Sequence, residues 1–310
     1  MGIKKFTGHL AAAFTIIVWA IGTAATENLL ELGLSSAEII LCRFVLSYVL
    51  LNIIYPPRLK FESVGRELTY AFAGLCGVTL YFFLESTALK YMSAVNAGVI
   101  LSLAPLFCGI FSLFAKNSGK PRAVFFVSFI IAAAGIFLIA LDEGFTPNFN
   151  KTGLVCALGA AVSWGAYSVL VRQIGSYGHN IIGSSRRIVM YGLIFMVPLL
   201  FVSDVTPSHI TMLSSSSVLV NILYLGILAS GLCFALWNRA ICTVGAVTTY
   251  SYSYAVPVIL LIFSWVYLKN QELSWELAAG TVLAAVGLVL SVACGEKKAD
   301  IRGKKKRKRK

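Results

Sequence analysis

Charged residues are scarce in this sequence. Asp, Glu, Lys and Arg make up 13% of its 310 residues, about half the share that is usual in a soluble domain. Apolar and aromatic residues make up 58%, and the mean hydropathy is +0.83. This composition excludes a soluble globular enzyme, a disordered protein and a secreted disulfide scaffold. It predicts an all-α polytopic membrane protein, because ten spans of roughly 20 residues would fill about two thirds of the chain.

The residue groups that a membrane enzyme needs are also missing. His9, His179 and His209 are far apart, and there is no pair of intramembrane carboxylates and no nucleotide-binding glycine loop. The seven cysteines lie inside or at the ends of apolar stretches without metal-ligand spacing, so we interpret them as packing residues. We therefore expect no catalytic residue, cofactor or metal. An integral membrane enzyme or a scaffold is the less favoured alternative.

Ten apolar segments follow one another along the chain. Each is long enough to cross a bilayer as a helix, which satisfies its own backbone polar groups. The expected spans are 9–30, 36–55, 68–88, 93–115, 122–141, 152–172, 181–203, 217–237, 246–268 and 275–294.

The distribution of Lys and Arg predicts the orientation of these spans. Basic residues gather at the N-terminus and on alternate connections, whereas the other side has only Lys90, Lys151 and Lys269. We therefore expect a cell-membrane protein with both termini in the cytoplasm. Ten of the 26 basic residues lie in the tail 295–310, which we interpret as a cytoplasmic anchor that touches anionic lipid. We expect no nucleic-acid partner.

The chain contains an internal repeat. With an offset of 152, residues 84–140 align on 236–292 without a gap, and Pro105 meets Pro257. Near the start of each half the offset is 145, so that Trp19 meets Trp164. An insertion of seven residues reconciles the two offsets. The repeat predicts two five-helix halves, 9–141 and 152–294, after a short cytoplasmic segment, 1–8.

An odd number of helices in each half has a structural consequence. The second half must enter the membrane upside down, so the prediction is ten transmembrane helices in two inverted repeats. Such folds place a binding site near the membrane midplane and open it alternately to either side. We therefore favour transport of a small molecule over a duplication that only forms a stable bundle. The oligomeric state cannot be read from this pattern.

Two ionisable residues inside the spans are the first candidates for a binding site, because charge in a membrane is costly. Glu85 could couple transport to protons or bind a cationic group, or it could only lock two helices together. Arg43 could hold a carboxylate, although a structural pairing is slightly favoured. The two lie at similar depth on adjacent antiparallel spans. We expect them to face the interior, within direct or one-water reach in at least one conformation.

Aromatic and polar residues complete the candidate set. Trp19 and Trp164 lie mid-span, away from the interfaces where Trp is usual, and could pack or line a cavity. Tyr250 and Tyr254 share a helix face, and Asn96 occupies the matching region of the fourth span, where a contact between helices is the alternative. Pro105 and Pro257 are expected to kink their helices. The remaining candidates are Tyr81 and Tyr167.

Several segments resemble the EamA family of the drug/metabolite transporter superfamily. Residues 15–22 and 161–167 are similar to the Trp-bearing first helix of each EamA repeat, and Cys42-Arg43-Phe44 to its second-helix pattern. Residues 85–97 resemble its third-to-fourth helix hairpin, and Ala240–Val247 the counterpart. The resemblance covers about 9–294.

This resemblance implies secondary transport, often export, of small metabolites such as amino acids. A purine, a sugar conjugate or a drug-like cation would fit the same composition. The resemblance also implies that the fifth and tenth helices pack outside the pore. Glu85 aligns with Trp237, so we expect a cavity that is chemically asymmetric.

Overall fold

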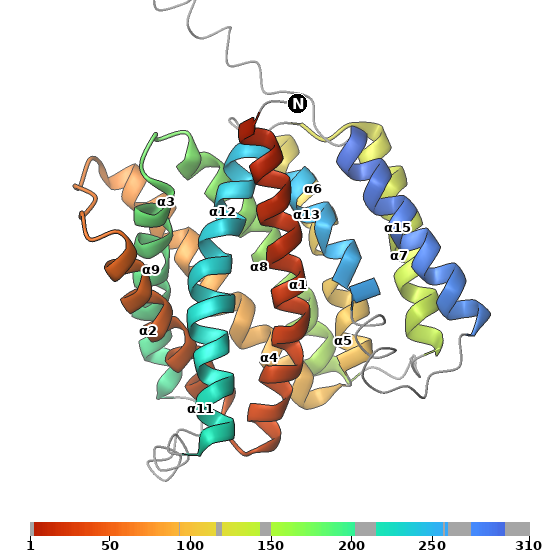
Figure 1. The fold of residues 1–310 in the computed structure, drawn as a ribbon, viewed down its shortest axis with the longest axis horizontal. Helices are drawn as coiled ribbons and strands as arrows, with labels where there is room; N and C mark the ends of the chain where they lie inside the picture. Colours follow the sequence, from red (N-terminus) through yellow and green to blue (C-terminus); the bar gives the residue numbers. More distant parts are fainter. Residues whose placement is uncertain are drawn as a thin grey trace, which may run out of the picture.

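The computed structural model describes residues 3–92, 94–115, 120–142, 150–201, 215–256, 258–259 and 274–294. These residues form helices and no strand, arranged as one bundle (Figure 1). Within them, nine helical spans are long and apolar enough to cross a membrane. The expected ninth span, 246–268, is described only at its start, and Pro257 and the basic tail lie outside the described residues.

The first half contains five spans, of which the third and fourth are each divided into shorter helices. Its elements are α1 (Ile3–Glu31), α2 (Ser36–Ile54), α3 (Val64–Gly74), the π-helix η1 (Leu75–Leu80), α4 (Tyr81–Tyr91), α5 (Ala94–Leu101), α6 (Ala104–Phe114) and α7 (Ala123–Asp142).

The second half repeats this order. Its described elements are α8 (Lys151–Gly175), α9 (Ile181–Leu200), α11 (Ser216–Leu223), the π-helix η2 (Tyr224–Leu232), α12 (Cys233–Val244), α13 (Ala246–Ser251), the 3-10 helix η3 (Tyr252–Ala255) and α15 (Trp275–Cys294).

Helix ends reproduce the two sequence offsets. The bounds of α15 lie 152 residues after those of α7, and α3 and α11 start at the same spacing. α2 and α9 start 145 residues apart. The seven-residue insertion therefore falls in the connection between the second and third spans of the second half.

The turns that enter the second span of each half are also equivalent. Gly33 has a φ of 97° and Gly178 a φ of 80°, a region that glycine adopts without a steric penalty. Two residues later, Ser35 caps α2 and Asn180 caps α9, and each side chain accepts a backbone N–H of the first turn. The same local chemistry thus reverses the chain in both halves.

Each half packs its first helix against the third span of the other half. α1 contacts η2 and α12, whereas α8 contacts η1 and α4. α2 packs against its own counterpart α9, and α7 against α15. This exchange of neighbours is expected for two repeats related by a two-fold axis, and the prediction of a helical membrane fold with two repeats is confirmed.

The close approach of α7 and α15 depends on glycine. A Cβ added at Gly135 would lie 2.6 Å from the carbonyl oxygen of Gly280 and 2.6 Å from the amide nitrogen of Ala284. The two helices lie side by side at one edge of the bundle (Figure 1). Small residues that let backbones approach closely are a common basis of helix association in membranes.

We expect Gly135→Val to lower the free energy of unfolding by about 1–3 kcal/mol, because the added side chain would overpack this contact. Thermal unfolding of the purified protein in detergent measures the change. Ala134→Val is the matched control, since Ala134 is exposed on the same helix. Equal effects of the two substitutions would contradict the assigned contact.

Candidate functional site

A cavity of about 400 Å³ lies between the two halves. Its walls come from α1, α2, α4, α5, α6 and α7 of the first half and from α8, η2, α12, α13 and η3 of the second. Its lining reaches Glu27 in the last turns of α1 and Leu89 near the end of α4. The cavity therefore extends to the end of the bundle that holds the α1–α2 turn, which we call the mouth end. Its volume is in the range of sites for small molecules.

Aromatic side chains form the inner part of this cavity. The ring of Trp19 lies 5.5 Å from that of Trp164 and 5.0 Å from that of Trp237. Tyr81 lies 4.4 Å from Trp164, and Tyr250 lies 5.8 Å from Trp237. The indole of Trp19 also donates a hydrogen bond of 2.9 Å to the carbonyl oxygen of Ala229. The two repeat-equivalent tryptophans thus meet each other across the interface of the halves.

Arg43 brings a positive charge to the cavity. Only 6% of the residue is exposed, and its Nε donates a hydrogen bond of 2.7 Å to the hydroxyl of Ser230 on η2. The guanidinium carbon lies 4.5 Å from the ring centre of Phe82, a cation–π distance. Its two terminal nitrogens form no hydrogen bond with the described residues. They remain available to a ligand.

Glu85 brings the negative charge. Its Oε1 accepts a hydrogen bond of 2.9 Å from the hydroxyl of Tyr81, one turn earlier on α4. Its second oxygen has no hydrogen-bond donor among the described residues. Arg43 and Glu85 line the same cavity and interact electrostatically, but they do not form a direct ion pair in this conformation. Each charge therefore retains hydrogen-bonding capacity.

Of the nine binding residues selected from the sequence, six line this cavity: Trp19, Arg43, Tyr81, Glu85, Trp164 and Tyr250. The other three do not. Tyr167 is buried and donates a hydrogen bond to Asn238, and Tyr254 packs against Phe129 and Ile136.

Asn96, the last of the nine, and Pro105 both lie in the fourth span. Asn96 is buried on α5, next to the cavity residue Ala97. The span is interrupted after Leu101, and α6 begins at Ala104 with Pro105 in its first turn. Because Pro lacks a backbone N–H, this position removes no hydrogen bond from the new helix. The break lies beside the cavity residue Ser102.

Sequence reasoning missed several cavity residues. The sequence indicates Trp237 only as the counterpart of Glu85 and does not single out Glu27 or Ser86, although all three contribute to the lining. The expectation that the fifth helix stays outside the pore is wrong, since Ile136 and Ile139 of α7 line the cavity. α7 is apolar on all sides, so no polar face in its sequence indicates this role.

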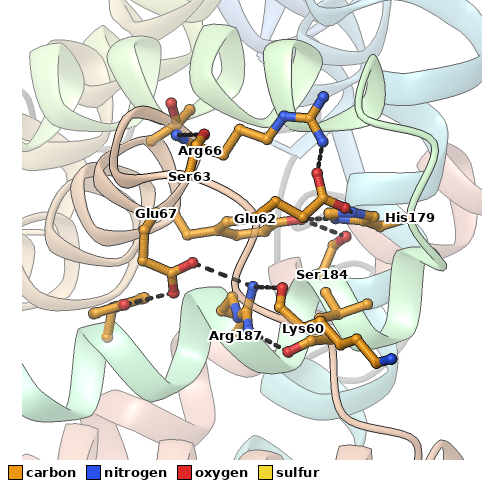
Figure 2. Close-up of polar contacts among 12 residues, drawn as sticks. Lys60, Glu62, Ser63, Arg66, Glu67, His179, Ser184 and Arg187 are labelled. Atoms are coloured by element: carbon orange, nitrogen blue, oxygen red, sulfur yellow. Dashed lines mark hydrogen bonds and ion pairs between the residues drawn. The ribbon is translucent and has the colours of Figure 1, made fainter.

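A polar cluster connects the two halves at the opposite end of the bundle (Figure 2). Arg187 on α9 donates to the backbone carbonyl oxygens of Leu59 and Lys60 and pairs with Glu67 at 3.3 Å. His179 lies 2.8 Å from the hydroxyl of Tyr70 through Nδ1 and 2.7 Å from Glu62 through Nε2. These contacts fasten the α2–α3 connection of the first half to the second half.

The surroundings of His179 favour its neutral form. Burial and the guanidinium groups of Arg66 and Arg187 lower the pKa of His179, and Glu67 opposes them. The Glu62 carboxylate lies next to the ring, but it is already paired with Arg66. The neutral imidazole can still bridge Tyr70 and Glu62 by donating from one nitrogen and accepting at the other.

We expect the folded protein to lose stability as the pH falls below the ordinary histidine value of 6.5. The unfolded chain then binds a proton at His179 that the folded chain does not bind, so acid favours unfolding. His179→Gln should remove this part of the pH dependence. Thermal unfolding between about pH 7.5 and pH 5.5 tests the expectation, and an unchanged pH dependence in the variant would contradict it.

The nine apolar spans found in the described part of the chain and a cavity lined by both halves are features of a multi-pass membrane transporter. The sequence matches the EamA-like transporter family twice, over residues 6–141 and 151–293. The chain belongs to this family, as its resemblance predicted.

Curated relatives agree with this assignment, and a solved structure shares the fold. The chain is similar to an uncharacterized transporter of Archaeoglobus fulgidus, with 27% identity over 92% of this chain and 97% of that protein. It is also similar to a probable terminal-alkyne amino-acid exporter of Streptantibioticus cattleyicolor, with 23% identity over 90% and 91%. A solved crystal structure superposes with a TM-score of 0.74 at 19% identity, covering 93% of this chain and 98% of that one. The transporter prediction is confirmed.

Proposed function

We propose that this transporter is a secondary carrier that exports amino acids or related zwitterionic metabolites. The observation that supports the proposal is that Arg43 and Glu85 line one cavity without forming a direct ion pair. Guanidinium nitrogens suit a carboxylate, and a carboxylate suits an ammonium group. A substrate with both groups would satisfy both charges.

The aromatic walls would hold the remainder of such a substrate. Trp19, Trp164 and Tyr250 present ring faces and edges to an apolar side chain, and aromatic faces also attract an ammonium group. The likeness to a probable amino-acid exporter supports the same substrate class. A purine, a sugar conjugate or a drug-like cation would need only one of the two charges or neither.

The mechanism that we propose is alternating access. Among the described residues, the cavity is lined by both halves and reaches the mouth end alone, whereas the cluster around His179 and Arg187 holds the other end together. The distribution of basic residues supports a cell-membrane protein with the mouth end outside the cell and both termini in the cytoplasm. Export would load the cavity in a second state that opens toward the cytoplasm, with protons as the proposed coupling ion. The basic tail would rest on anionic lipid.

Arg43→Lys tests the proposed carboxylate site. Lysine keeps the charge but lacks the Nε contact to Ser230 and the planar fork that binds a carboxylate in a bidentate manner. We expect about tenfold less amino-acid counterflow in proteoliposomes, since hydrogen bonds to charged groups contribute about 1.5–3 kcal/mol. Arg239→Lys is the control, because Arg239 is exposed. Full counterflow in Arg43→Lys would contradict the assignment.

Glu85→Gln separates binding from coupling. The amide oxygen can still accept the hydrogen bond from Tyr81, but the side chain no longer titrates. We expect flux driven by a pH gradient to be lost, while exchange without a gradient is less affected. The measurement compares both fluxes in the same proteoliposomes. Normal flux driven by the gradient would remove Glu85 from the coupling mechanism.

A further inference from the structure

The two halves correspond helix by helix, so a contact in one half has a defined counterpart in the other. Gly33 and Gly178 set the offset of 145 between α1 and α8, and α4 and α12 begin 152 residues apart. Arg172 of α8 therefore corresponds to Glu27 of α1. Lys90 of α4 corresponds to Cys242 of α12.

At the end opposite the mouth, α8 and α12 are in contact. The Nη1 atom of Arg172 donates hydrogen bonds of 3.0 Å and 2.6 Å to the carbonyl oxygens of Ile241 and Cys242. These carbonyls belong to the last turn of α12, where the helix dipole favours a cation. The oxygen of Ile241 also accepts the backbone N–H of Gly245, whereas that of Cys242 is among the acceptors left over at a helix end. A Cβ added at Gly175 would lie 2.5 Å from the sulfur of Cys242. The contact closes this end.

At the mouth end, the corresponding helices α1 and α4 face each other across the cavity. Glu27 and Leu89 both belong to its lining. Within the described residues, α1 and α4 share no hydrogen bond or ion pair, and neither Glu27 nor Lys90 pairs with an opposite charge. The structure is thus asymmetric at two places that the repeat makes equivalent.

We propose that Glu27 and Lys90 form the gate that closes the mouth when the other end opens. In that state α1 would approach α4 as α8 now approaches α12, and Arg172 would leave the carbonyl oxygens of α12. The proposal rests on the alternating-access mechanism given above. It gives a role to Glu27 and Lys90, which belong neither to the proposed binding site at Arg43 and Glu85 nor to the sequence motifs.

Charge explains why this gate needs a lysine. A carboxylate at the position of Glu27, brought against the last turn of α4, would meet free carbonyl oxygens and the negative end of the helix dipole. Lys90 lies in that last turn and supplies the opposite charge. Arg172 needs no such partner, because its guanidinium binds the carbonyl oxygens of α12 directly.

Cysteine labelling of purified protein in nanodiscs tests the gate without any substrate. A single cysteine, Thr23→Cys, is placed in the cavity lining in a background that lacks the seven native cysteines. Arg172→Ala should lower the ratio of mouth-open to mouth-closed protein by about tenfold, the effect of losing hydrogen bonds from a charged group. Maleimide labelling of the cysteine then slows.

A second substitution identifies the closing pair. Lys90→Gln added to Arg172→Ala should restore labelling, because the mouth can no longer be held shut. Glu31→Gln is the matched control, since Glu31 lies one turn beyond Glu27 and outside the lining, and it should not restore labelling. Unchanged labelling in folded Arg172→Ala protein, or equal effects of Lys90→Gln and Glu31→Gln, would overturn the proposal.

Charge reversal covers the case in which Arg172→Ala does not fold. Glu27→Lys or Lys90→Glu alone should increase labelling of the cavity cysteine, and the two together should return it to the starting rate. Failure of the double variant to do so would also overturn the gate. If the gate passes these tests but the protein shows no amino-acid flux, the alternating-access mechanism is supported and amino acids are ruled out as the substrate. Amino-acid flux together with a failed gate test would support the substrate and rule out the gate formed by Glu27 and Lys90.

Discussion

The burial of Arg43 is the constraint on which the rest of the site depends. A guanidinium inside an apolar bundle is costly unless its donors find partners. Here Ser230 and the ring of Phe82 satisfy one part of the group, and Glu85 supplies a nearby opposite charge that Tyr81 orients. Because Arg43 and Glu85 do not form a direct ion pair, both side chains can still form hydrogen bonds with a ligand.

Repetition and asymmetry have separate roles in this molecule. The repeat fixes where helices begin and which helices pack together, as the equivalent turns at Gly33 and Gly178 demonstrate. Asymmetry provides the chemistry, since Glu85 has Trp237 as its counterpart and Arg43 has Ile188. One half therefore contributes both charges, and the other contributes the hydroxyl of Ser230 and much of the aromatic surface. A symmetric scaffold can alternate between two states while its site remains chemically directional.

The fold was predictable from the sequence to an unusual degree, because an ungapped offset transfers the bounds of α7 directly to α15. Charged and aromatic residues in apolar spans were equally informative, and Arg43, Glu85 and Trp19 all reach the cavity. Apolar lining was not predictable. Ile136 belongs to a helix that is apolar all round, and Tyr254 shares a face pattern with Tyr250 yet packs against α7. The two tyrosines lie on either side of the change from α13 to η3, and such a helix break depends on packing between distant segments.

The most direct test of the account is a comparison of ligands that differ by one charge. Calorimetry can measure how tightly the purified protein binds an amino acid, its carboxamide, which lacks the carboxylate, and its deaminated acid, which lacks the ammonium group. We expect the amino acid to bind at least about tenfold more tightly than either analogue, since each charge should contribute a hydrogen-bonded contact of about 1.5–3 kcal/mol. Equal affinity for the carboxamide and the amino acid would contradict the role of Arg43, and equal affinity for the deaminated acid would contradict that of Glu85. Either result would contradict the zwitterion site.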